Sequence, residues 1–186
     1  MINPKISVIV CTYNGEKRIT HLLDSLKKQT YKNLEIVIVD DGSSDGTSDI
    51  VKKYPFRLIR HRTNRGLADS RNTGIKSSKG DIIIFTDDDC VADKNWVREI
   101  AKCYSKNRDI NAAGGRIEPY SLNTYFEKYE YYGKQPIYSH STSFGSGGRI
   151  KNYLSRMFST RKNKLKDGQK LSSVMGLNSS YKREIK

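Results

Sequence analysis

The chain has 186 residues, 35% of them hydrophobic and 29% charged, and a formal net charge of +14. This length suffices for one domain with a buried core, and no apolar stretch reaches the ~18–20 residues that a transmembrane helix requires. The first residues lack the pattern of a signal peptide. Three cysteines without metal-binding spacing argue against a disulfide framework. We therefore expect a cytoplasmic protein with reduced thiols.

Strand-like and helix-like segments alternate through the first hundred residues. Short apolar runs predict strands at residues 6–11, 34–39, 56–60 and 81–86, with a further strand at 110–116. Helical periodicity, as in Ile19, Leu22, Leu23 and Leu26, predicts helices at 19–26, 44–53, 68–78 and 96–104. Such alternation indicates βαβ units, and therefore an α/β fold with a mostly parallel sheet flanked by helices.

Polar side chains follow three of the predicted strands. Thr12-Tyr13-Asn14 follows the first strand, Asp40-Asp41 the second and Asp87-Asp88-Asp89 the fourth. Ligands of open α/β sheets bind outside the carboxyl ends of the strands. Because the carboxyl ends of parallel strands lie at one edge of the sheet, we expect these three clusters to form a single site.

The three consecutive acids are the most informative of these clusters. Carboxylates so close together repel one another, and a divalent cation with oxygen ligands would hold them and bind a phosphate. Side chains at positions i and i+2 of a strand lie on one side, which groups Asp87 with Asp89 and leaves Asp88 aside. Oxygen ligands without a His or Cys cluster favour Mg²⁺ or Mn²⁺ over zinc. The alternative is a solvated acidic turn.

Four ordered motifs extend this interpretation. They are the runs at residues 7–14 (SVIVCTYN), 39–47 (VDDGSSDGT), 64–74 (NRGLA followed by RNTG) and 86–89 (TDDD). Their order and spacing resemble glycosyltransferase family 2 over roughly residues 5–115. The resemblance implies a GT-A fold, which is Rossmann-like, with a nucleotide-sugar donor such as a UDP-sugar, a divalent metal and usually inversion at the sugar carbon.

The resemblance also implies which residues contact the nucleobase. Tyr13 would stack on the base, with Cys11 and Thr12 lending polar groups. Asp41 would accept a hydrogen bond from the N–H of the base ring, and Asp40 is a second candidate for this role. Two alternatives remain open at this point, namely a tyrosine that covers the edge of the core and acids that favour the dipole of the next helix.

The remaining expected contacts lie near the phosphates and the ribose. By the resemblance, Asp89 ligates the metal and Asp87 binds the ribose or shares the metal shell, and Asp88 belongs to the nucleotide-sugar site beside them. Arg71 lies near the nucleotide, where a guanidinium can pair with phosphate. A structural ion pair between Arg71 and one of the acids is the alternative.

The catalytic base is the point at which the sequence departs from the family. Inverting transfer requires a carboxylate that deprotonates the acceptor hydroxyl, and in the family this carboxylate lies in a downstream acidic pair. Residues 175–184 resemble the segment just before that pair, and the sequence ends at Lys186. We therefore expect a truncated chain, with the base beyond Lys186, weak nucleotide-sugar binding and little or no turnover. The alternative is a non-catalytic nucleotide-sugar-binding or scaffold module.

The sequence divides into two expected regions. Residues 1–118 would form the nucleotide-sugar-binding GT-A core, and residues 119–186 a partial acceptor-side region. Residues 149–186 carry a net charge of +9, and an apolar helical face runs through residues 150–158. This basic amphipathic segment either covers the core or lies on the inner face of the cell membrane, where a lipid-linked or cell-envelope glycan acceptor would be found. Because no nucleic-acid-binding motif accompanies the charge, we expect no nucleic-acid partner.

Overall fold

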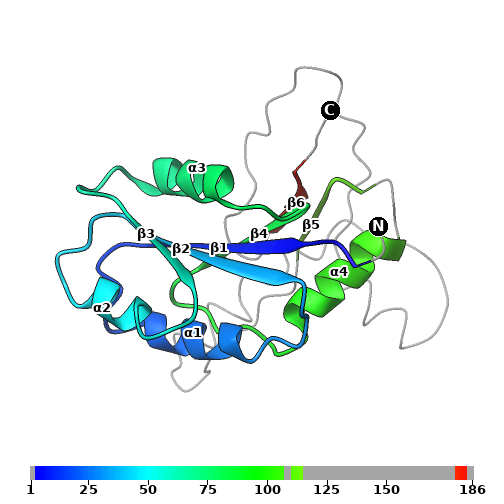
Figure 1. The fold of residues 1–186 in the computed structure, drawn as a ribbon, viewed down its shortest axis with the longest axis horizontal. Coiled ribbons are helices and arrows are strands. Elements are labelled where there is room, and N and C mark those ends of the chain that lie inside the picture. Colours follow the sequence, from blue (N-terminus) through cyan, green and yellow to red (C-terminus); the bar gives the residue numbers. More distant parts are fainter. Residues whose placement is uncertain (1–2, 107–109, 115–178, 184–186) are drawn as a thin grey trace, which may run out of the picture.

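Six strands form one sheet with the order β3-β2-β1-β4-β6-β5 in this computed structural model, which describes residues 3–106, 110–114 and 179–183. The strands are β1 (Ile6–Thr12), β2 (Leu34–Asp40), β3 (Arg57–Arg60), β4 (Ile82–Asp87), β5 (Ala112–Gly114) and β6 (Ser179–Lys182) (Figure 1). The helices are α1 (Ile19–Lys27), α2 (Thr47–Val51), α3 (Leu67–Ser77) and α4 (Trp96–Lys106).

The first four strands are parallel, as the alternation of the sequence predicts. β1 pairs with β2 on one side and with β4 on the other, and β3 pairs with β2. The predicted helix at 44–53 is shorter in the structure, because only Thr47–Val51 is helical, and the predicted strand at 110–116 is observed as Ala112–Gly114. The α/β class and the mostly parallel sheet are confirmed.

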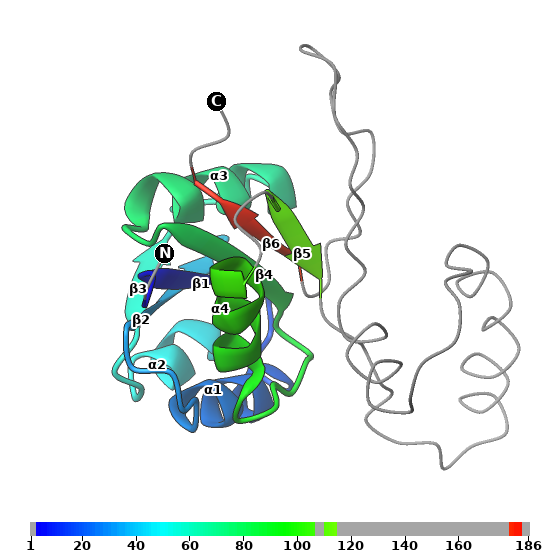
Figure 2. The ribbon, with the colours of Figure 1, turned by 90° about the vertical axis from the view of Figure 1, so that its right-hand side faces the viewer.

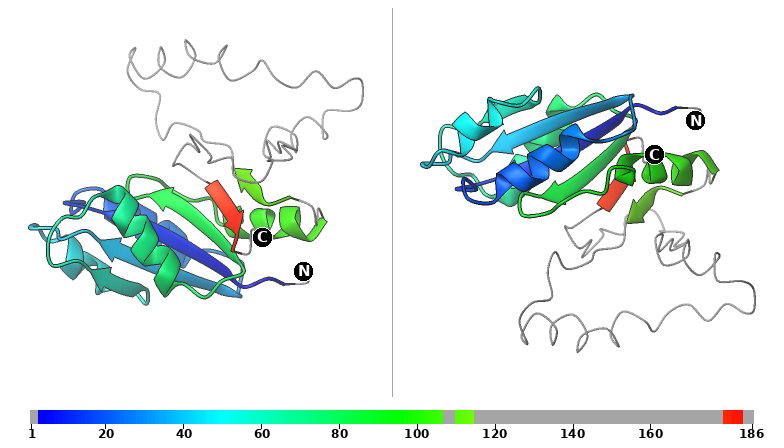
Figure 3. Two further views of the ribbon diagram at one scale, coloured as in Figure 1. Left: turned by 90° about the horizontal axis from the view of Figure 1, so that it is seen from above. Right: turned by 90° about the horizontal axis from the view of Figure 1, so that it is seen from below.

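Helices cover both faces of the sheet. α3 lies on one face, and α1, α2 and α4 lie on the other (Figure 2). Seen from the two sides, α3 crosses the central strands and α1 runs beneath them (Figure 3). The four apolar residues of α1 predicted to face the core (Ile19, Leu22, Leu23 and Leu26) are at most 1% exposed. Burial of each such side chain contributes about 1.5–3 kcal/mol, so this helix is held mainly by its apolar stripe.

Sequence reasoning did not predict β6. It pairs antiparallel with β4 and with β5, and so lies between two strands that are distant from it in sequence. Its residues, Ser179-Ser180-Tyr181-Lys182, lack the alternation of a half-buried strand. Buried Ser180 instead satisfies its hydroxyl in the sheet, donating to the carbonyl of Ala113 (2.7 Å) and contacting the hydroxyl of Tyr104 (3.1 Å).

The expected division into residues 1–118 and 119–186 stays a prediction. Within the described residues, β6 belongs to the same sheet as β1–β5, so part of the second region completes the sheet of the first. The basic amphipathic segment around the apolar face at 150–158 lies outside the described residues. Among the helices that the structure describes, none has the length and hydropathy to cross a membrane.

The close approach of α3 to the sheet depends on Gly74. A Cβ at this position would lie 2.4 Å from Cγ2 of Ile9 on β1. We expect Gly74→Ala to lower the free energy of unfolding by about 1 kcal/mol, because overpacking costs about 1–3 kcal/mol and exceeds the helix-propensity gain of about 1 kcal/mol. Urea unfolding measures this change. The control is Asn72→Ala, an exposed position of the same helix, and a stabilised Gly74→Ala protein would contradict the packing described here.

Candidate functional site

The parallel register aligns the carboxyl ends of β1, β2, β3 and β4. Thr12 is opposite Asp40, Asp40 is opposite Arg60, and Cys11 is opposite Asp87. The residues that follow these strands therefore lie at one edge of the sheet, as expected from the sequence. The structure brings together Tyr13, the Asp40-Asp41 pair and the Asp87-Asp88-Asp89 motif.

Two loops at this edge bind each other through hydrogen bonds. In the β1–α1 loop, the N–H of Asn14 donates to Ser43 Oγ (2.9 Å) and the N–H of Gly15 donates to Thr47 Oγ1 (2.8 Å). In return, the N–H of Ser44 in the β2–α2 loop donates to Asn14 Oδ1 (2.9 Å). These bonds fix the backbone next to Tyr13 relative to the backbone next to Asp41.

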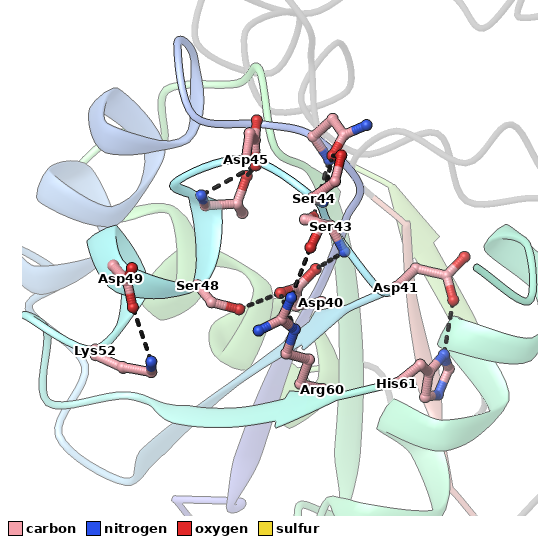
Figure 4. Close-up of polar contacts among 12 residues, drawn as sticks. Asp40, Asp41, Ser43, Ser44, Asp45, Ser48, Asp49, Lys52, Arg60 and His61 are labelled. Atoms are coloured by element: carbon pink, nitrogen blue, oxygen red, sulfur yellow. Dashed lines mark hydrogen bonds and ion pairs between the residues drawn. The ribbon is translucent and has the colours of Figure 1, made fainter. Parts of the chain in front are cut away.

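Asp40 is fully buried, and both of its carboxylate oxygens are engaged within the chain (Figure 4). Oδ1 accepts the N–H of Ser43 (2.9 Å), and Oδ2 accepts the hydroxyl of Ser48 and lies 3.4 Å from Nε of Arg60. These contacts hold the β2–α2 loop. A role for Asp40 in base recognition stays a prediction.

Asp41 is 4% exposed and contacts the buried ring of His61. Its Oδ1 lies 2.7 Å from Nδ1 of His61 (Figure 4). Oδ1 also accepts the N–H of Arg65 (2.9 Å), and Oδ2 accepts the N–H of Gly66 (2.8 Å). Nε2 of His61 lies 3.0 Å from the hydroxyl of Thr73 on α3. Since the carboxylate accepts, Nδ1 of His61 carries a proton.

The hydrogen bonds of Asp41 decide its ionisation. Burial raises the pKa of Asp41. The hydrogen bonds from His61, Arg65 and Gly66 together outweigh this rise, so the pKa lies below its usual value of 3.8. Asp41 is therefore a carboxylate at neutral pH, and it can accept but not donate hydrogen bonds. Sequence reasoning missed His61, because a single histidine after a strand does not indicate which residue it will contact.

The middle acid of the motif, Asp88, is buried and points away from solvent. Its Oδ2 accepts the hydroxyl of Thr12 (2.6 Å), and its Oδ1 accepts Nε of Arg18 (2.8 Å). Asp88 therefore turns into the protein, although it lies just beyond the end of β4 and strand alternation does not account for its direction. Its expected contact with the nucleotide sugar stays a prediction. Sequence reasoning also missed Arg18, because an exposed cation gives no indication of an acid 70 residues away.

Asp87 and Asp89 are the more accessible acids of the motif. Nη2 of Arg71 lies 3.8 Å from Oδ1 of Asp87, and the Arg71 guanidinium lies over the ring of Phe85, 5.6 Å from its centroid. Burial raises the pKa of Asp87 above its usual 3.8, Arg71 opposes this, and the negative charges of Asp89 and Asp88 add to it. The ion pair predicted as an alternative for Arg71 is thus present with Asp87.

This acidic pair is chemically suited to a divalent cation. Asp87 and Asp89 would supply oxygen ligands, and a cation would counter both the burial and the neighbouring negative charge that raise the pKa of Asp87. Among the described residues, no group of three or more His, Cys, Asp or Glu side chains is arranged to hold a metal ion. The remaining ligands would therefore come from a bound molecule or from water, as is usual for Mg²⁺.

Tyr13 and Cys11 differ in accessibility. Tyr13 is 44% exposed, which leaves its ring available for stacking. Burial raises the pKa of Cys11 to about 12, with Arg71 opposing the rise, so this thiol stays protonated and is a poor nucleophile. None of the three cysteines, all of which lie in the part of the chain that the structure describes, forms a disulfide. Two cavities, of about 270 and 420 Å³, lie elsewhere, next to Tyr31 and near the amino-terminal ends of β2 and β3.

A sequence model of the family described as "Glycosyl transferase family 2" matches residues 7–185. The chain belongs to this family. This confirms the resemblance on which the expected GT-A fold rested, and the solved structures that resemble the chain are glycosyltransferases of that fold.

Three proteins of known name or structure are similar to this chain. A glucosyl-dolichyl phosphate glucuronosyltransferase from Haloferax volcanii is 33% identical over 121 residues, covering 62% of this chain and 39% of that protein. The mannosyltransferase PcManGT from Pyrobaculum calidifontis, in complex with GDP-Man and Mn²⁺, is 29% identical with a TM-score of 0.56, covering 60% and 35%. S. aureus TarS 1–349 with UDP-GlcNAc is 34% identical with a TM-score of 0.56, covering 63% and 38%. The chain thus spans less than half the length of these relatives.

The lowered pKa of Asp41 predicts how the stability of this chain changes with pH. A carboxylate whose pKa is depressed in the folded state contributes stability above its unfolded pKa and loses it as the pH falls through the folded pKa. We expect Asp41→Asn to lower the free energy of unfolding by about 1–3 kcal/mol at pH 6, and the difference to shrink as the pH falls from about 5 to below the ordinary Asp value of 3.8.

Urea unfolding between pH 6 and pH 3 measures this difference. The control is Asp69→Asn, which removes an exposed ion pair with Arg65 (3.2 Å) and should change stability by less than about 1 kcal/mol. A deficit of Asp41→Asn that is constant over the whole pH range would contradict the assignment.

Proposed function

We propose that this chain binds a nucleotide-sugar donor, most simply a UDP-sugar, at the carboxyl edge of its sheet, as the donor-binding part of a metal-dependent, inverting glycosyltransferase. The observation that carries the proposal is the register, which brings an exposed tyrosine, an ionised buried aspartate and an acidic pair to one edge. Family membership supports it. So do the solved relatives, one with GDP-Man and Mn²⁺ and another with UDP-GlcNAc.

In this proposal, Tyr13 and Asp41 recognise the base. The exposed ring of Tyr13 offers a stacking surface, and base–aromatic stacking contributes about 1–3 kcal/mol per base. Because Asp41 is a carboxylate, it selects a base edge that offers an N–H, as uracil does at N3. Cys11 and Thr12 border the same position at the end of β1.

The acidic pair and Arg71 would face the diphosphate. Asp89 and Asp87 would hold Mg²⁺ or Mn²⁺, which offsets the charge on the leaving nucleoside diphosphate when bound. Arg71, which lies over the ring of Phe85 and close to Asp87, would pair with a phosphate oxygen. With a cation present, Asp87 would be ionised in spite of its burial.

The acceptor proposed is a cell-envelope glycan or a lipid-linked sugar. The name of the Haloferax volcanii relative includes a dolichyl phosphate-linked sugar, which supports the lipid-linked form. A cytoplasmic enzyme at the inner face of the membrane would suit such an acceptor, and the basic segment at 149–162 would attract anionic lipids there.

Titration calorimetry with UDP, with and without Mn²⁺, tests the donor site. We expect the 186-residue chain to bind UDP in the presence of Mn²⁺, and Asp89→Ala to weaken that binding at least about tenfold, because the cation loses one of its two protein carboxylates. Asp49→Ala is the matched control, since it removes an exposed acid of α2 that pairs with Lys52 and should leave UDP binding unchanged.

Two results would contradict this proposal. One is UDP binding that does not depend on Mn²⁺ or on Asp89. The other is binding of polyanions with a steep salt dependence that Asp89→Ala does not change, as expected of a nucleic-acid-binding protein. Sugar transfer by the same chain, assayed with a labelled UDP-sugar, separates a transferase from a module that only binds the donor.

A further inference from the structure

The middle acid of the acidic motif is connected to the loop that carries Tyr13. Asp88 accepts the hydroxyl of Thr12, the last residue of β1, and the Nε of Arg18, the residue before α1. Asp88 is buried, and its two oxygens join the end of β4 to both ends of the β1–α1 loop.

Arg18 uses all three guanidinium nitrogens in this connection. Nε donates to Asp88 Oδ1 (2.8 Å), Nη1 to the carbonyl of Asn14 (3.1 Å) and Nη2 to the carbonyl of Tyr13 (3.0 Å). A planar guanidinium can make these three bonds only in one orientation. The backbone of Tyr13 is therefore linked to the acidic motif through a single side chain.

The loop has no room for a side chain where it passes this link. A Cβ on Gly15 would lie 2.4 Å from Thr12 Oγ1 and 2.7 Å from Asp88 Oδ2. On its other side, the loop is bonded to Ser43 and Thr47. The backbone of residues 13–15 is thus held from two directions, by the β2–α2 loop and by the acidic motif.

We propose that Arg18 and Asp88 are positioning residues, which fix the distance between the base-stacking ring of Tyr13 and the metal-binding pair Asp87 and Asp89 without contacting the donor. A nucleoside diphosphate has a fixed span from base to diphosphate, so a donor site gains affinity when its two ends are held in advance. This inference rests on the proposed function. The competing role for Arg18, whose side chain is 45% exposed, is direct contact with the diphosphate.

Hydrogen exchange tests the positioning role without any ligand. We expect Arg18→Gln to speed amide exchange at Asn14, Gly15 and Glu16 by about tenfold or more, because the loop loses its link to Asp88 and opens more often. Exchange in the central strands should stay slow. Lys17→Gln is the matched control, since it removes the neighbouring exposed cation. Unchanged exchange at these three amides in Arg18→Gln would overturn the proposal.

A double-mutant cycle for UDP binding with Mn²⁺ separates positioning from direct contact. If Arg18 acts through Tyr13, Arg18→Gln should weaken binding about tenfold in the wild-type background and less than about twofold in the Tyr13→Ala background. If Arg18 contacts the diphosphate itself, the two effects should multiply, which would overturn the proposal.

Arg18→Lys gives an independent check, because it keeps the charge and loses the three-way geometry. We expect Arg18→Lys to resemble Arg18→Gln both in exchange and in UDP affinity, and full rescue by lysine would contradict positioning. Absence of UDP binding in the unmodified protein would argue against the proposed function, and the exchange experiment would still decide whether Arg18 holds the loop.

Discussion

Parallel strands that end together force the acidic residues following them into one small region. At this edge lie Asp40, Asp41 and the three acids of the Asp87-Asp88-Asp89 motif. Carboxylates this close repel one another, and their burial adds a desolvation cost. The arrangement is stable only if most of these charges have partners, and the partners available within the chain decide which acids can serve a ligand.

The partners are unevenly distributed among the acids. Asp40 is engaged by Ser43, Ser48 and Arg60, Asp41 by His61 and two backbone N–H groups, and Asp88 by Thr12 and Arg18. Asp87 has Arg71 at 3.8 Å and a raised pKa, and Asp89 is exposed. The two acids with the weakest internal compensation are thus the two proposed to bind a cation. Because the other acids have partners within the chain, the excess of negative charge remains at Asp87 and Asp89, where a divalent metal would bind most strongly.

The same hydrogen bonds also make the edge rigid. The β1–α1 loop is bonded to the β2–α2 loop and to the end of β4, and Asp41 holds the start of α3 through the N–H of Gly66. A binding site built from loops needs such support, because groups that are loosely held lose affinity when they are ordered. Under the function proposed for this chain of glycosyltransferase family 2, the same rigidity would hold the two ends of a nucleotide sugar at a set separation.

The sequence alone determined the parallel part of the sheet, because apolar runs and helical stripes alternate there and β1, β2 and β4 are each followed by polar residues. It also determined that Tyr13, Asp41 and Asp89 share one edge, since this follows from strand direction. Only the tertiary structure showed that Asp40 and Asp88 are turned into the protein, that His61 contacts Asp41 and Arg18 contacts Asp88, and that β6 completes the sheet. These features depend on side-chain contacts between residues far apart in sequence, whereas local periodicity reports only which face of an element is apolar.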